Sequence, residues 1–293
     1  MKKLLLAIFA GSVGYAVACT TFASFNGADN SVVMAKNRDN RPDHQVIEVV
    51  NTPGKFKYLA LSRKDVPDFV SAGINEKNLA VFNEVTVEYS DQAKGGIADD
   101  FSRDILQNYS TVKAVIPDIP KLIAKFPDPV FYQVADAKNI LSIEVAPNHK
   151  YSYKLIDRGT MAHTNNYLSA ELIKNYPYSD AENARLLGST TRLNRASYLV
   201  SHESAPDLAK LQQIALDHSA GSNDSIFRTG DGHKPNTVRS LAFFGVEIAK
   251  DGKMPSKVSS YLYASGERFD YTLTPQFWAQ YSEAVTFLTA AGK

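Results

Sequence analysis

Cysteine and tryptophan each occur only once in this chain of 293 residues, at Cys19 and Trp278. A single cysteine excludes an intramolecular disulfide, and a chain of this length can build a core without one. Neither sign of charge dominates, because 32 basic residues stand against 31 acidic ones, and this argues against a nucleic-acid partner. With 16 Gly and 13 Pro, the composition is that of an ordinary globular protein.

Long apolar runs are also missing, and the one short run is at the N-terminus. Lys2 and Lys3 precede it, and it ends in Ala16-Val17-Ala18, which has the small-x-small form of a cleavage site. The run is shorter than the roughly 20 apolar residues of a membrane-spanning helix. We therefore predict that residues 1–18 are a signal peptide, removed by signal peptidase, and that the protein is exported to the periplasm or secreted.

Cleavage after residue 18 makes Cys19 the first residue of the remaining chain. An incidental thiol is a poor explanation for a lone cysteine at this position. A lipid-anchored binding protein, acylated on Cys19, is a second interpretation, although Ala16 replaces the leucine usual three residues before such a cysteine. In the third interpretation Cys19 is an N-terminal nucleophile. Its thiol attacks, and its own α-amino group, with a pKa of roughly 8, is the general base.

The pattern of apolar residues predicts strands in the first half of the chain. Strand-like runs occupy residues 20–25, 31–35, 46–50, 57–61, 69–72, 79–87, 130–134, 140–145 and 151–156. The turn-forming segment 26–30 joins the first two strands, and we expect Cys19 at the exposed end of the first. Residues 97–109 have helical periodicity, and residues 111–126 predict a helix broken by two prolines.

The second half predicts mainly helices, at residues 184–199 and 207–218, followed by a loop at 219–236 and strands at 240–248 and 258–263. Thr274-Pro275 is a helix-start pattern, so we expect a last helix to about Ala290 that carries Trp278. Runs of strands followed by runs of helices favour an α+β fold. We see no repeat or linker, and predict one domain over residues 19–293.

Five motifs in order resemble those of the cysteine N-terminal nucleophile hydrolases. They are Cys19-Thr20-Thr21, Lys36-Asn37-Arg38-Asp39, residues 73–81, His163-Thr164-Asn165-Asn166, and residues 189–195. This family includes choloylglycine (bile salt) hydrolases, penicillin V acylases, acid-ceramidase-like amidases and isopenicillin N acyltransferases. The resemblance implies a four-layer αββα sandwich and the hydrolysis of a small linear N-acyl amide through a thioester.

By this resemblance Cys19 is the nucleophile and Asp39 holds its α-amino group and thiol in place. Taken alone, Asp39 also fits a turn at the end of a strand. The family has an arginine where this chain has Lys36, so either Lys36 or Arg38 takes that role. Residues two apart on a strand point the same way, which leaves both open.

The resemblance also implies an oxyanion hole and a further arginine. Asn165, with backbone amides, would stabilise the oxyanion, although an asparagine pair also suits a turn. Asn83 is a second oxyanion candidate that aligns only with a gap. Arg195 matches the family arginine near the nucleophile. Arg192 lies three residues before it, on the same helix face, so both are expected to face the site unless they are solvated surface residues.

No cofactor is predicted, and the six histidines lack the spacing of metal ligands. The acyl group is not identified, since bile salts, penicillin V, acyl homoserine lactones, small peptides and N-acyl ethanolamines all fit. An acyltransferase results if an acceptor other than water takes the acyl group. The resemblance allows a homo-oligomer.

Overall fold

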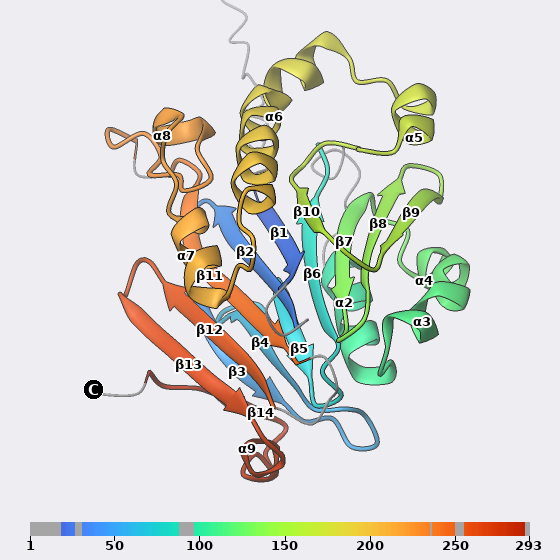
Figure 1. Ribbon diagram of the computed structural model, residues 1–293, viewed down its shortest axis with the longest axis vertical. Coiled ribbons are helices and arrows are strands. Elements are labelled where there is room, and N and C mark those ends of the chain that lie inside the picture. The colour runs from blue at the N-terminus through green and yellow to red at the C-terminus, as the bar shows by residue number, and fades with distance from the viewer. Residues whose placement is uncertain (1–18, 27–30, 88–96, 235, 250–254, 291–293) are drawn as a thin grey trace, which may run out of the picture.

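The computed structural model describes residues 19–26, 31–87, 97–234, 236–249 and 255–290. The predicted signal peptide and residues 27–30 of the predicted turn lie outside these ranges. The described chain forms two antiparallel sheets with helices on their outer faces (Figure 1).

The first sheet has six strands in the order β10-β1-β2-β11-β12-β13. Their bounds are β1 (Thr20–Phe25), β2 (Val32–Asn40), β10 (Thr160–His163), β11 (Arg239–Ile248), β12 (Ser256–Leu262) and β13 (Glu267–Leu273). The predicted hairpin is present, because β1 pairs antiparallel with β2 and the backbone N–H of Asn26 donates to Ser31 O at 2.8 Å. The strand that begins after Cys19 therefore lies inside the sheet, between β10 and β2.

The second sheet has eight strands in the order β14-β3-β4-β5-β6-β7-β8-β9. Their bounds are β3 (Gln45–Val50), β4 (Tyr58–Arg63), β5 (Ala72–Asn75), β6 (Ala80–Val85), β7 (Val130–Ala135), β8 (Ile140–Ala146), β9 (Lys150–Ile156) and β14 (Val285–Phe287). From β3 to β9, each strand pairs with the next along the chain, so this sheet is a meander.

Most of the helices lie on the outer faces of the two sheets, whereas the last described helix contributes Phe277 and Trp278 to the core between them. Their bounds are α2 (Ile97–Asn108), α3 (Val112–Val115), the 3₁₀ helix η1 (Ile116–Asp118), α4 (Ile119–Lys125), α5 (Ala170–Asn175), α6 (Asp180–Ser201), α7 (Leu208–Ala215), α8 (Gly221–Asp224) and α9 (Pro275–Ala279). Helices α6 and α7 contact β1, β2 and β11, whereas α2 contacts β5 and β6 (Figure 1). Among the described helices, none is long and apolar enough to cross a bilayer.

Apolar side chains fill the space between each pair of layers. Between the sheets, Phe82 of β6 meets Phe244 of β11 edge to face, with ring centroids 5.7 Å apart. Under α6 and α7, Ala196 and Leu211 belong to a cluster with strand residues of the first sheet. Under α2, Phe101 belongs to a cluster with strand residues of the second. The predicted α+β, four-layer αββα sandwich is confirmed.

Strand β2 shows how the sequence produces these layers. Its unbroken apolar start places Val32 and Met34 in the core between the sheets, and Val33 and Ala35 under the helices. Successive side chains of a strand point to opposite faces, so a strand buried on both faces carries no polar alternation. The same strand then continues with four polar residues, 36–39, that are also buried. Buried charges are rare in proteins unless they are paired, so this end of β2 is the natural place to seek a site.

The predicted last helix is wrong in its length. Thr274 caps α9 and Pro275 is its first residue, as expected, but the helix ends at Ala279 and residues 285–287 pair with β3 as β14. Lys57 Nζ donates to the carbonyls of Trp278 and Tyr281, at 2.9 and 2.7 Å, and satisfies acceptors at the helix end. Strands β10 and β13 and helix α5 had no prediction.

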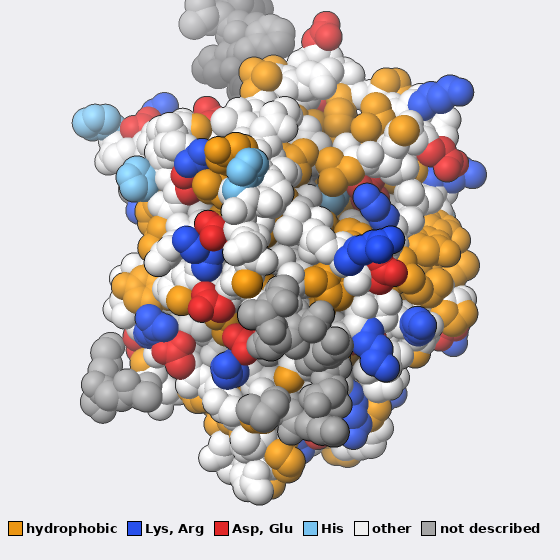
Figure 2. All heavy atoms as spheres, viewed as in Figure 1, with side chains coloured by type: hydrophobic (Ala, Val, Ile, Leu, Met, Phe, Trp, Pro, Cys, Tyr) orange, Lys and Arg blue, Asp and Glu red, His pale blue; other side chains and the backbone are white. Residues whose placement is uncertain are grey.

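The charges on the surface are mixed. Figure 2 shows basic and acidic side chains interspersed over one face, without a broad region of either sign. This agrees with the nearly balanced composition of the chain.

Candidate active site

Cys19 directly precedes β1, and its side chain is buried, with 8% of its surface exposed. The expectation of an exposed strand end is therefore wrong, because β1 lies between two other strands and beneath α6. The pairing of Thr20 with Asn37 carries the start of β1 to the end of β2. As a result, Cys19 Sγ lies 3.9 Å from the backbone oxygen of Asp39.

Asp39 has one carboxylate oxygen in use and one free within the described structure. Its Oδ1 accepts a hydrogen bond from Ser240 Oγ at 2.6 Å. Its Oδ2 is buried and has no hydrogen-bond partner among the described residues. Burial raises the pKa of Asp39 to about 6, although the positive charges of Arg228 and Arg192 oppose the shift. The carboxylate is thus ionised at neutral pH and retains an unused acceptor.

Ser240 and Arg228 were missed by the sequence reasoning. The pairing of β2 with β11 shifts register between Ser240 and Ala242, a bulge that leaves Ser240 opposite Asp39. Ser240 N donates to Arg228 O at 2.9 Å, and Arg228 N donates to Ser240 Oγ at 3.0 Å. Neither residue lies in a motif, and a bulge leaves no signal in a single sequence.

Lys36 connects β2 of the first sheet to the second sheet. Its side chain is fully buried, and Nζ donates to Ser71 O and Ser71 Oγ, both at 2.9 Å, and to the backbone oxygen of Asn83. Burial lowers the pKa of Lys36, while the nearby Cys19 and Glu84 oppose that shift. Lys36 Nζ is therefore held by backbone and hydroxyl oxygens of Ser71 and Asn83, close enough to Cys19 for the two groups to interact electrostatically.

Arg38 points to different partners, although it lies two residues from Lys36 on the same strand. Its Nη2 is 3.0 Å from Asp43 Oδ2, and its guanidinium lies over the Phe69 ring at 5.0 Å. Asp99 of α2 is a further acidic neighbour. Burial raises its pKa to about 7, against the charges of Arg38 and Lys36. Asp99 was not anticipated from the sequence.

The two oxyanion candidates differ in how their amides are used. Asn83 Nδ2 donates to Val70 O at 2.7 Å and to Ser102 Oγ at 3.1 Å, which engages both of its N–H groups. Asn165 Nδ2 donates to Val85 O at 2.8 Å, and within the described residues its second N–H makes no hydrogen bond. Asn165 Oδ1 accepts from Arg192 Nη2 at 3.1 Å. Because a guanidinium group only donates, this contact distinguishes the oxygen of the Asn165 amide from its nitrogen. Only Asn165 retains a donor for a ligand.

Arg192 and Arg195 do not share one environment. Arg192 is buried, and burial lowers its pKa to about 10 while Asp39 and Cys19 oppose the shift. Arg195 is 37% exposed and donates to Asp217 Oδ2 from Nη2 at 2.7 Å and from Nε at 3.0 Å. The structure thus brings Arg192 to Cys19 and does not bring Arg195 there, because helix α6 meets the first sheet along the side that bears Arg192.

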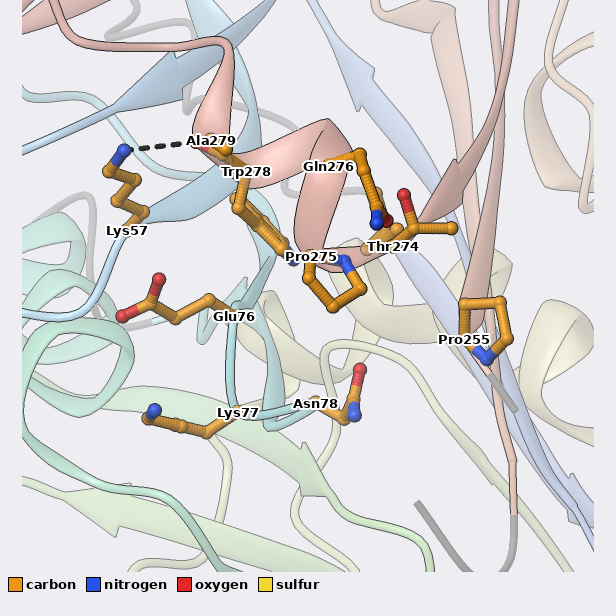
Figure 3. A pocket seen from close by; sticks show the side chains of 11 residues that line it. Lys57, Glu76, Lys77, Asn78, Pro255, Thr274, Pro275, Gln276, Trp278 and Ala279 are labelled. Carbon is orange, nitrogen blue, oxygen red and sulfur yellow. Dashed lines mark hydrogen bonds between the residues drawn. The ribbon is translucent and has the colours of Figure 1, made fainter. Parts of the chain in front are cut away.

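One well-defined cavity shares no residue with this cluster. It has a volume of about 620 Å³ and lies between the turn after β5 and helix α9, with Glu76, Lys77, Asn78 and Trp278 in its lining (Figure 3). Lys57 at its edge is already held by the carbonyl of Trp278. Within the described residues, no group of three or more His, Cys, Asp or Glu side chains is arranged to hold a metal ion.

Known proteins share the sequence pattern and the fold of this chain. Residues 25–252 match the family model described as acyl-coenzyme A:6-aminopenicillanic acid acyl-transferase. A search of curated proteins found no significant match. Among solved structures, the penicillin V acylase from Agrobacterium tumefaciens is similar, with a TM-score of 0.56 and 16% sequence identity over 92% of this chain and 91% of that chain. At this identity the likeness concerns the fold, which is that of the N-terminal nucleophile hydrolases.

Proposed function

This chain belongs to the acyl-coenzyme A:6-aminopenicillanic acid acyl-transferase family, and we propose that it hydrolyses linear N-acyl amides with Cys19 as nucleophile. The observation that carries the proposal is the buried Oδ2 of Asp39, which has no hydrogen-bond partner among the described residues, on a residue whose backbone oxygen lies 3.9 Å from Cys19 Sγ. In the full chain Cys19 N belongs to a peptide bond with Ala18. Cleavage after Ala18 would release an α-ammonium group, and a carboxylate with a free lone pair is the partner that such a group needs.

The reaction we propose begins with proton transfer from the Cys19 thiol to its own α-amino group. The thiolate attacks the amide carbonyl carbon, and the charge moves to the carbonyl oxygen. Asn165 Nδ2, with backbone N–H groups, donates to that oxyanion; such a donor typically lowers the barrier by about 3–4 kcal/mol. As the C–N bond breaks, the leaving amine takes the proton from the α-ammonium group and a thioester remains.

Deacylation repeats the sequence with water. Water gives a proton to the α-amino group and attacks the thioester carbonyl, and the second oxyanion again accepts from Asn165. The C–S bond breaks, the carboxylic acid leaves, and the thiolate regains the proton. In this scheme Asp39 holds the α-amino group, Arg192 supplies positive charge near the thiolate, and Lys36 ties β2 to Ser71 and Asn83. Arg38 and Asn83 support the site without contacting the substrate, and Arg195 lies outside it, bound to Asp217.

An acyltransferase is the second candidate. The name of the matching family favours it, because members of this kind transfer an acyl group to an amine acceptor. The same acyl-enzyme serves both reactions, and only the group that attacks the thioester differs. Hydrolase activity is preferred here because a solved structure with a similar fold is that of a penicillin V acylase.

Export belongs to the same proposal. A signal peptide at residues 1–18 would keep the protein inactive until signal peptidase exposes Cys19. A small N-acyl amide in the periplasm or outside the cell would be the substrate, and neither a cofactor nor a metal would be required.

The test compares two purified chains that differ by one residue, one beginning at Cys19 and the other at Ala18. Both are assayed against a panel of N-acyl amides, with release of the free amine as the readout. Activity confined to the chain that begins at Cys19 is the expected result. Equal turnover by both chains would exclude the α-amino group as the base. Cys19→Ala in the shorter chain is the control, and it should abolish turnover.

A further inference from the structure

A single buried carboxylate holds both ends of the loop that carries Asn165. Glu144 of β8 approaches His163, just before the loop, with Oε1 3.3 Å from His163 Nε2. After the loop, Leu168 N donates to Oε1 at 2.9 Å and Ser169 N donates to Oε2 at 3.0 Å. The Glu144 side chain thereby holds both ends of the segment between His163 and Leu168.

His163 links the same loop to strand β6. Its side chain is fully buried, and Nδ1 lies 3.0 Å from Glu84 Oε2. The next residue of β6, Val85, accepts the hydrogen bond from Asn165 Nδ2. The ring of His163 therefore lies between carboxylates of two strands of the second sheet, although His163 itself ends strand β10 of the first sheet.

We propose that Glu144 and His163 are positioning residues for Asn165, and that they hold its free N–H at the place where an oxyanion forms. This inference rests on the proposed function, because it assumes that Asn165 acts on an oxyanion. Glu144 and Glu84 lie outside the five motifs, so no role for them was predicted from the sequence.

The physical reason is the sensitivity of an oxyanion hole to position. A displacement of about 1 Å at a catalytic group can reduce the rate about 100-fold. Glu144 stabilises the loop through acceptors for two backbone N–H groups and a negative charge for His163. A glutamine at this position keeps the volume but offers one acceptor oxygen and removes the charge, so one donor is left unsatisfied and the loop shifts.

The test is Glu144→Gln, with Glu48→Gln as the matched control. Glu48 of β3 is also buried in the second sheet, and its Oε1 accepts from Ser62 Oγ at 2.6 Å without contact to the Asn165 loop. In the chain that begins at Cys19, we expect Glu144→Gln to reduce kcat about 10- to 100-fold, with KM within about twofold. Glu48→Gln should leave both constants within about twofold.

A double-mutant cycle separates positioning from general damage. In an Asn165→Ala background, Glu144→Gln should cause no further loss of kcat, because the group that it positions is absent. The rate of Cys19 alkylation by iodoacetamide, which needs no oxyanion hole, should be unchanged in Glu144→Gln. Additive losses of kcat, or an equal fall in the alkylation rate, would overturn the proposal.

NMR spectroscopy tests the position of the Asn165 amide without a measurement of catalysis. The NMR signals of the Asn165 side-chain amide, assigned by their loss in Asn165→Ala, should move in Glu144→Gln and stay in place in Glu48→Gln. Signals that do not move in Glu144→Gln would refute the positioning role even in an inactive protein. Absence of turnover in the wild-type chain, with moved signals, would refute the proposed function instead.

Discussion

At the scale of single residues, the carboxylate of Asp39 carries a cost that a functional role explains. Burial raises its pKa to about 6 from an ordinary 3.8, so the folded chain binds more protons than the unfolded chain between these values. Stability therefore falls as pH rises from about 4 to about 6, and the loss persists at neutral pH. A residue kept only for stability would not be charged here.

Asp39→Asn tests whether the buried charge of Asp39 lowers the stability of the protein and is needed for its activity. In a chain extended before Cys19, the variant should be more stable than wild type at pH 7, by roughly 1–3 kcal/mol, because the buried charge is gone. In the chain that begins at Cys19, the α-ammonium group compensates the wild-type charge, so the gain should shrink and activity should be lost. Thermal unfolding of wild type and Asp39→Asn, in each of the two chain lengths, measures these differences in stability. The same gain in both chains would contradict a contact between Asp39 and the α-amino group.

The asparagines give a second prediction at this scale. Asn165→Ala removes the amide that retains a free N–H and should reduce kcat about 100- to 1000-fold with little change in KM. Asn83→Ala removes an amide whose two N–H groups are engaged inside the protein. It should reduce stability by roughly 1–3 kcal/mol and leave the barrier for the folded fraction nearly unchanged. Steady-state kinetics with denaturant unfolding separates the two, and equal losses of kcat would contradict the assignment.

Most residues named from the motifs do come together. Cys19, Lys36 and Asp39 follow from the pairing of β1 with β2, which the turn signal predicts. Arg195 could not be placed from the sequence, because helical spacing puts two arginines on one face and does not determine which of them reaches the sheet. Ser240 comes from a bulge some 200 residues further along the chain, and no local pattern announces such a contact.

At the scale of elements, helix α6 packs closely against α8 at Gly188, one helical turn before Arg192. A Cβ on residue 188 would lie 2.2 Å from Asp224 Oδ1, so the carboxylate of α8 occupies the space that a side chain would fill. The charge of Asp224 in turn supports the guanidinium of Arg192.

Gly188→Ala should therefore displace Asp224 and loosen Arg192, which holds Asn165. We expect a several-fold loss of kcat, while the better helix propensity of alanine, about 1 kcal/mol, offsets part of the clash in the free energy of unfolding. Asp224→Asn removes the charge without adding a Cβ and should reproduce the loss of kcat. Full activity in both variants would show that the close packing of Asp224 against Gly188 has no role in the site.

The elements also show why sequence patterns succeed or fail. Strands such as β2 and β8 are buried on both faces and carry short, mainly apolar runs, which are easy to recognise. Strand β10 has only four residues and exists through its pairing with β1. The segment after α9 pairs with β3 as a three-residue edge strand, a tertiary contact that overrides a helix-start signal read correctly at Thr274.

At the scale of the whole molecule, the two sheets are joined by charges as well as by apolar packing. Burial opposes protonation of His163, but its pairing with Glu144 and Glu84 raises the pKa to about 9 from 6.5. Since the folded pKa lies above the unfolded one, the stabilisation is fully present below about pH 6.5 and is lost as pH rises through about 9.

Stability of the wild-type chain should therefore fall between pH 6.5 and 9 by roughly 2–3 kcal/mol more than that of His163→Gln, which lacks the titrating group. Urea unfolding at pH 6, 7.5 and 9.5 measures the difference. Parallel curves for the two proteins would mean that the charge on His163 does not join the sheets.

The mass of the acyl-enzyme identifies the nucleophile. The chain that begins at Cys19 is mixed with an N-acyl amide that it turns over, quenched in acid and digested, and each peptide is weighed. The account predicts the mass of the acyl group on the peptide that begins at Cys19, removable by hydroxylamine as expected of a thioester. Turnover with the acyl group on another residue, or with no adduct in a burst-phase sample, would contradict Cys19 as the nucleophile.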